Sequence, residues 1–111
     1  MQLSYAIKYV ADMQRAVAFY RDKLGIELKF ESPFWSEFAT GDTVLALHPA
    51  SDENPAGGVE LGFAVDNLGE FYARRDALGV EFTREPKEQH GVHIAQIRDA
   101  DGAHVSVSGP V

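Results

Sequence analysis

Apolar and polar positions along the chain follow first the period of a strand and then that of a helix. Residues 3–10 are rich in Tyr, Ile and Val and stop at a polar residue, which predicts a strand. Residues 13–24 carry apolar side chains every three or four positions, which predicts a helix. Asp12 is a suitable N-cap, and we expect Gly25 to end the helix in the left-handed conformation.

Shorter apolar segments follow, and we expect most of them to be strands. A second helix is predicted over residues 68–78, capped by Asp66 or Asn67 and ended by Gly79. Residues 85–91 (EPKEQHG) show no such period, so we expect a mobile loop there. The other predicted strands cover residues 26–31, 35–39, 43–48, 59–65, 80–83, 92–98 and 103–108.

The second half of the chain repeats the first, because residues 60–82 echo residues 5–30. The repeat predicts two βαβββ modules, residues 1–49 and 59–111, joined by a linker at 50–58. Neither module has enough apolar surface to be stable alone, so we expect the two to pack as one domain. The predicted class is α+β, with a curved eight-stranded mixed sheet that forms a trough.

Charge and composition exclude several partners. The chain has 17 acidic and 10 basic residues, a net charge of −7, which repels nucleic acid and anionic lipid. There is no cysteine, so disulfides and thiolate sites are excluded. The first residues lack the pattern of an export signal, and no apolar run reaches the roughly 18 residues of a membrane span. We therefore expect a cytoplasmic protein without nucleic-acid or membrane partners.

Two segments carry a resemblance to a known family. VADMQRAVAFYRDKLGIEL (10–28) and DADGAHVSV (99–107), together with the repeat, resemble the vicinal oxygen chelate superfamily. This superfamily contains glyoxalases, extradiol dioxygenases and bleomycin resistance proteins. The resemblance covers almost the whole chain and implies a glyoxalase/bleomycin resistance fold and a homodimer.

The resemblance also implies where a metal would bind. Metal-using members take two ligands from each half, and the matching positions here are Tyr5, Ala46, Glu60 and Ser106. A phenol, a methyl group and an aliphatic hydroxyl are poor ligands for a divalent ion. The chain therefore resembles the binding-only members, which have no metal cofactor and enclose an aromatic or cationic drug.

A displaced metal site is the alternative. His48 and His104 each lie two residues from a lost ligand position, and with Glu60 they would make a set of two histidines and one carboxylate. Such a set suits one divalent ion such as zinc, nickel or iron. The competing interpretation is that both histidines lie at strand ends on the rim of the trough.

Glu60 is the main candidate for chemistry, because it sits in a strand expected to be largely buried. Its carboxylate would bind a cationic ligand or act as a general base. The structural alternative is a hydrogen bond to Tyr5 or Ser106.

The remaining candidates would line the ligand site. Trp35 and Phe38 offer flat surfaces for stacking, although Phe38 also suits the core. Tyr5 and Ser106 offer hydroxyl groups, and His93 is expected near the ligand. The predicted ligand-binding residues are Tyr5, Trp35, Phe38, His48, Glu60, His93, His104 and Ser106.

Two functions stay open at this point. The first is a metal-free small-molecule binding protein of the drug or natural-product type, as in antibiotic resistance. The second is a glyoxalase-like lyase or isomerase, with or without a metal, in which Glu60 is the catalytic residue. The sequence does not decide whether the chain is an enzyme.

Overall fold

The computed structural model describes all 111 residues and divides them into two compact units. The N-terminal unit is Ser4–Val59, and the C-terminal unit is Glu60–Val111 with Met1–Leu3. Each contains one strand, a helical segment and three further strands, in the order that the sequence repeat predicts. None of the helices is long and apolar enough to cross a membrane.

The first half of the chain forms its helix where the caps predict it. The Asp12 side chain accepts a hydrogen bond from the Arg15 amide at 3.1 Å, and Gly25 has a φ of 69°. The last turn is π-helical, with the Leu24 amide bonded to the Phe19 carbonyl at 3.2 Å. The elements are β1 (Gln2–Val10), α1 (Met13–Ala18), η1 (Phe19–Lys23), β2 (Glu27–Phe30), β3 (Ser36–Ala39) and β4 (Val44–Pro49).

In the second half the N-cap is Asn67, whose side chain accepts from the Glu70 amide at 2.9 Å. Gly79, with a φ of 70°, ends the helical segment as predicted. That segment is split in two at Arg74. The elements are β5 (Val59–Ala64), α2 (Leu68–Ala73), α3 (Arg75–Leu78), β6 (Phe82–Gln89), β7 (Val92–Arg98) and β8 (His104–Ser108).

The predicted mobile loop at 85–91 is wrong, because β6 continues through Gln89 and only His90 and Gly91 make the turn. β6 is an edge strand that pairs with β7, and its register shifts between Phe82 and Arg84 and again between Arg84 and Lys87. Pro86 lies in the second irregularity. A proline at a bulge on an edge strand removes no sheet hydrogen bond, so the strand tolerates it.

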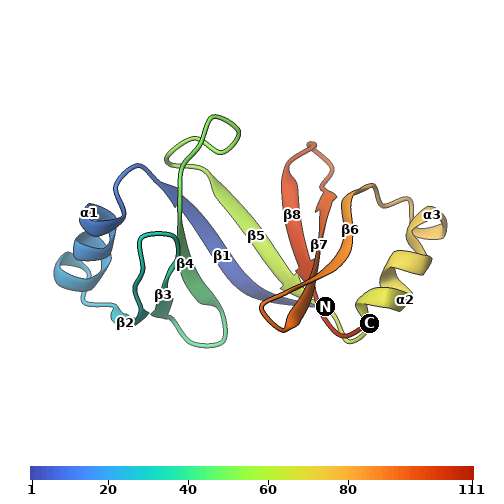
Figure 1. The fold of residues 1–111 in the computed structure, drawn as a ribbon, viewed down its shortest axis with the longest axis horizontal. Helices are drawn as coiled ribbons and strands as arrows, with labels where there is room; N and C mark the ends of the chain where they lie inside the picture. Colours follow the sequence, from blue (N-terminus) through green and yellow to red (C-terminus); the bar gives the residue numbers. More distant parts are fainter. The chain divides into compact units, whose positions relative to one another are not determined.

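The two units have the same strand order. Along the sheet the N-terminal unit runs β2-β3-β4-β1 and the C-terminal unit runs β6-β7-β8-β5. In each, the first strand is parallel to the fourth and the other pairs are antiparallel. Each unit carries its helices on one face of its own strands (Figure 1). The α+β class and the mixed eight-stranded composition are therefore confirmed.

The core of each unit lies between its helix and its sheet. In the N-terminal unit it is formed by Val10, Val17, Phe38 and Leu47, and in the C-terminal unit by Leu68, Ala95 and Val107. Because strand residues alternate between faces, the opposite face of each sheet presents a different set of side chains. We call this opposite face the open face of that unit.

Candidate functional site

Three side chains form an aromatic cluster on the open face of the N-terminal unit. The ring centroid of Trp35 lies 6.1 Å from that of Tyr5 and 6.2 Å from that of His48. We call Tyr5, Trp35 and His48 the aromatic face. Trp35 and Tyr5 are partly buried and His48 is exposed, so the aromatic face keeps surface that a ligand can contact.

Strand register explains why these residues meet. β1 and β4 are parallel with Tyr9 opposite His48, so Tyr5, Tyr9 and His48 project from one face. The Tyr9 ring packs edge-on against His48, with centroids 5.5 Å apart. Trp35 precedes β3 and is held by Ser32, whose hydroxyl donates to the Trp35 carbonyl at 2.8 Å and accepts from the Trp35 amide at 3.0 Å.

A carboxylate lies beside the aromatic face. The indole Nε1 of Trp35 donates to Oε2 of Glu37 at 2.8 Å. Burial and then the negative charge of Glu37 raise the pKa of the Tyr5 phenol, so Tyr5 stays neutral and can donate a hydrogen bond. Glu37 was not among the residues predicted to line the site, although its two-residue spacing from Trp35 places both on one strand face.

The open face of the C-terminal unit carries four polar side chains that we call the polar network: Glu60, Ser106, Gln96 and Thr83. The Ser106 hydroxyl donates to Oε2 of Glu60, and the Gln96 amide donates to Oε1 at 3.4 Å. Thr83 in turn donates to Oε1 of Gln96 at 3.2 Å. The predicted hydrogen bond between Glu60 and Ser106 is therefore confirmed, whereas Gln96 and Thr83 were not anticipated.

Glu60 is only 7% exposed, and a buried carboxylate is costly unless hydrogen bonds compensate it. Replacing Ser106 with Ala removes one of those bonds, and we expect the free energy of unfolding to fall by about 1–3 kcal/mol. Urea denaturation measures the change. Ser108→Ala is the control, because its hydroxyl lies 3.5 Å from the Phe63 carbonyl and no carboxylate depends on it. Equal losses in the two variants would contradict the role given to Ser106.

The other predicted residues are placed differently. Phe38 is fully buried in the core beside α1, so its side chain has no surface that a ligand could contact. His93 lies two residues before the core residue Ala95 on β7, so its side chain shares the face of Ala95 and projects away from the face of Gln96. His104 pairs with Arg98 in the sheet and lies on the same strand face as Ser106.

His93 lines a hollow of about 410 Å³ that no residue of the polar network lines. Its backbone carbonyl accepts a hydrogen bond from the Gly109 amide at 3.1 Å. Gly91, Val92 and Pro110 are among its neighbours there. His93 is therefore not brought together with Glu60 in the C-terminal unit.

The four positions that correspond to metal ligands in the superfamily carry few atoms that could bind a metal ion. Ala46 is fully buried and has no donor atom, and the Ser106 hydroxyl donates to Glu60, so neither is a good metal ligand. No group of three or more His, Cys, Asp or Glu side chains is placed to hold a metal ion. The alternative set divides between units, with His48 in one and Glu60 and His104 in the other. It stays a prediction.

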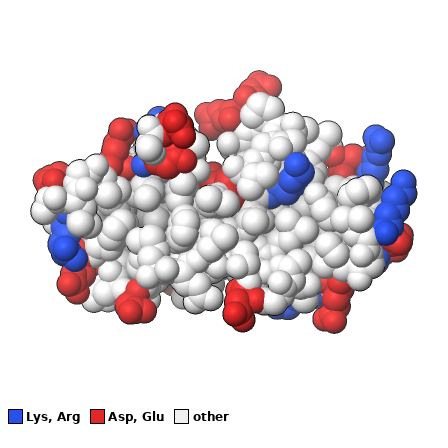
Figure 2. Space-filling view, turned by 180° about the vertical axis from the view of Figure 1, so that it is seen from behind, with Lys and Arg blue, Asp and Glu red and all other residues white.

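Acidic side chains dominate the charged surface. Figure 2 shows them at several places around the margin of the face that it presents. With 17 acidic and 10 basic residues, the surroundings of any site are negative on average. Such a field favours cationic over anionic small molecules in general.

Comparisons with known proteins agree on the fold. The Bacillus subtilis (strain 168) protein described as "Uncharacterized protein YetH" is 27% identical, covering 91% of this chain and 92% of its own. The solved structure of methylmalonyl-CoA epimerase from Mycobacterium tuberculosis has a TM-score of 0.81 at 22% identity, over 99% of this chain and 88% of that one.

A second solved structure, hypothetical protein BH1468 from Bacillus halodurans C-125, has a TM-score of 0.83 at 17% identity, over 99% of this chain and 94% of that one. At these identities the two structures establish the fold and not an activity. The family model described as Glyoxalase/Bleomycin resistance protein/Dioxygenase superfamily matches residues 2–107. The chain belongs to this superfamily.

Proposed function

We propose that this chain is a metal-free small-molecule binding protein whose ligand is aromatic or cationic, as in a drug-binding or sequestration role. The observation that carries the proposal is the aromatic face with the Glu37 carboxylate 2.8 Å from the Trp35 indole nitrogen. Flat rings next to a fixed negative charge suit a planar cation. At ligand sites, aromatic side chains supply most of the contact area with the ligand, and a few polar groups fix the orientation of the ligand.

Two specific interactions would add to the free energy that a ligand gains by burying apolar area on the aromatic face. A cation over a tryptophan ring is worth about 0.5–2 kcal/mol, and stacking of aromatic rings adds about 0.5–1.5 kcal/mol beyond buried area. The net charge of −7 raises the local concentration of a cation further. Tyr5, as a neutral phenol, offers a hydrogen-bond donor at the same place.

A second candidate function rests on Glu60. Its buried carboxylate is the kind of group that acts as a general base in a metal-free lyase or isomerase, with a histidine as the acid. The likeness in fold to an epimerase is compatible with such chemistry. We favour the binding function, because both Glu60 oxygens already accept hydrogen bonds, from Ser106 and Gln96.

A fluorescence titration tests the binding function. Trp35 is the only tryptophan, so emission reports on the aromatic face alone. We expect N-methylquinolinium, a planar aromatic cation, to change this emission along a saturating curve. Quinoline, its neutral counterpart at pH 7, should bind about tenfold more weakly.

Protein purified without chelator and protein treated with a chelator should give the same curve. A linear, unsaturating response to N-methylquinolinium would contradict the proposal. So would binding that disappears on chelation and returns with zinc, nickel or iron. That second result would favour the metal-dependent enzyme instead.

A further inference from the structure

The edge strand β6 carries a feature that the proposed function does not use. Its two register irregularities change which side chains share a face. Phe82 and Arg84 are two residues apart although their partners on β7, Ile97 and Gln96, are adjacent. Glu85 and Pro86 separate Arg84 from Lys87, although only one residue separates the partners of those two on β7. Without these bulges, Arg84 and Lys87 would point to opposite faces.

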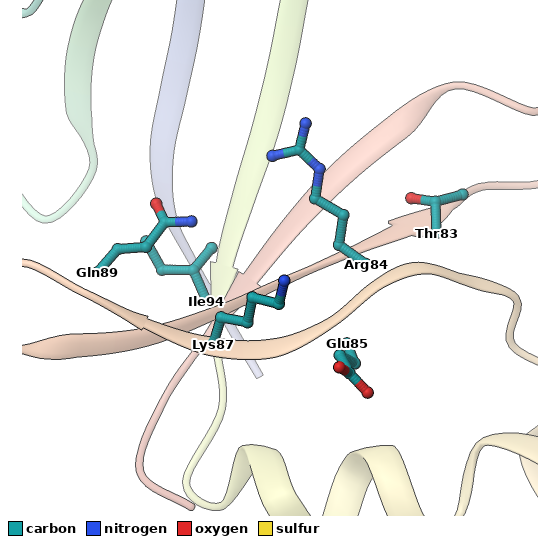
Figure 3. Close-up of a pocket in the computed structure, with 6 residues that line it drawn as sticks. All are labelled: Thr83, Arg84, Glu85, Lys87, Gln89 and Ile94. Carbon is teal, nitrogen blue, oxygen red and sulfur yellow. The ribbon is translucent and has the colours of Figure 1, made fainter.

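With the bulges, the cationic side chains point the same way. Figure 3 shows Arg84, Lys87 and Gln89 extending from one side of β6, while Glu85 extends to the other. Arg84 lies opposite Gln96 and Lys87 opposite Ile94 in the sheet, so this side is the open face of the C-terminal unit. The chain thus uses two bulges to bring two cations together next to the polar network.

These side chains line a hollow of about 410 Å³. Its lining residues are Thr83, Arg84, Glu85, Lys87, Gln89 and Ile94. Neither Arg84 nor Lys87 forms an ion pair, since the two ion pairs of the chain join Arg21 to Asp22 and Arg98 to Glu81. Arg84 and Lys87 thus place two positive charges without ion-pair partners at one hollow of a protein whose net charge is −7.

We infer that this hollow binds the carboxylate or phosphate group of a small molecule through Arg84 and Lys87. A guanidinium presents several parallel N–H donors and an ammonium supplies a point charge, and together they match an oxyanion. The Gln89 amide adds a neutral donor at the same side of the strand. The lining of this hollow belongs to the C-terminal unit and includes no residue of the aromatic face, so the inference does not depend on the function proposed for that face.

A competing use exists for the same residues. Exposed edge strands often carry cations that prevent pairing with another chain, and such cations bind no ligand. The two uses differ in one measurable respect. A binding site gives saturable, localised contact with an oxyanion at constant ionic strength, whereas solvated cations give only weak, spread-out effects.

The test is a titration of the full chain with sodium phosphate or sodium acetate, followed in the ¹H–¹⁵N amide spectrum. Sodium chloride keeps the ionic strength constant. We expect saturating shifts confined to residues 83–89 and Ile94. The double variant Arg84→Gln/Lys87→Gln should weaken the response about tenfold or more. The double variant Lys23→Gln/Lys29→Gln removes the same charge elsewhere and should bind as the unmodified chain does.

A stronger response to phosphate than to acetate identifies a phosphate ligand, and the reverse identifies a carboxylate. The inference is overturned if neither anion saturates or if the two double variants respond equally. Lys87→Gln alone replaces the first double variant if that one loses its dispersed spectrum. An unchanged titration in a folded Lys87→Gln chain would likewise overturn the inference.

Discussion

Phe38→Ala should lower the free energy of unfolding by about 3–5 kcal/mol, the largest stability effect that we expect from one substitution. Phe38 is fully buried and packs with Val17 and Leu47 between α1 and the sheet. Its ring lies 5.8 Å from that of Tyr20, measured between centroids. Removing the ring leaves a cavity that a single small unit has few ways to fill. Urea denaturation followed by circular dichroism measures the loss.

Phe30→Ala is the matched control for this substitution. Phe30 is 54% exposed in the same unit, so the same change of side chain should cost under about 1 kcal/mol. If Phe38→Ala were no more destabilising than Phe30→Ala, Phe38 would not be a core residue. The ligand-lining position that the sequence suggested for it would then have to be restored.

The second large effect concerns ligand affinity. Trp35→Ala removes the central ring of the aromatic face, which contacts both Tyr5 and His48. We expect the dissociation constant for N-methylquinolinium to rise about tenfold or more, because both the stacking area and the cation–π contact are lost. Isothermal titration calorimetry is the suitable measurement, since the variant has no tryptophan emission.

The neighbouring Phe34 provides the control. It is 76% exposed, and Phe34→Ala removes a similar amount of aromatic surface one residue away. The affinity of Phe34→Ala should stay within about twofold of the unmodified chain. Equal losses in Phe34→Ala and Trp35→Ala would mean that the ligand does not select the aromatic face.

Local signals in the sequence were sufficient for most of the fold. Asp12 and Gly25 define the first helical segment, and Asn67 and Gly79 define the second, because cap residues act through bonds to nearby backbone groups. The repeat of these signals also predicts that both halves share one strand order. The structure has that order in each unit.

The face of the sheet on which each candidate side chain lies was harder to predict. Trp35 and Phe38 are three positions apart near one strand, so alternation separates them, and only Trp35 lies on the aromatic face. The same rule separates His93 from Gln96 on β7. Residue type alone does not say on which face of a sheet a side chain lies, whereas the register of the strand does.

Most of the length of β6 was missed for a related reason, because the strand predicted at 80–83 covers only the start of it. Its sequence, Phe82–Gln89, contains a proline and five charged or amide side chains after Thr83, which is unlike a buried strand. Edge position and bulges make this composition acceptable. No signal within the segment shows that a neighbouring strand, β7, will pair with it.

Glu37→Gln separates the contribution of the carboxylate charge from that of the aromatic rings, through the preference of this variant for a cation over its neutral counterpart. Glutamine keeps an acceptor for the Trp35 indole but removes the charge. Calorimetry with N-methylquinolinium and quinoline should give a ratio of dissociation constants of about ten for the unmodified chain and a clearly smaller ratio for the variant, in which the cation–π contact with Trp35 remains. A ratio near one in the unmodified chain, or no change on substitution, would contradict the account.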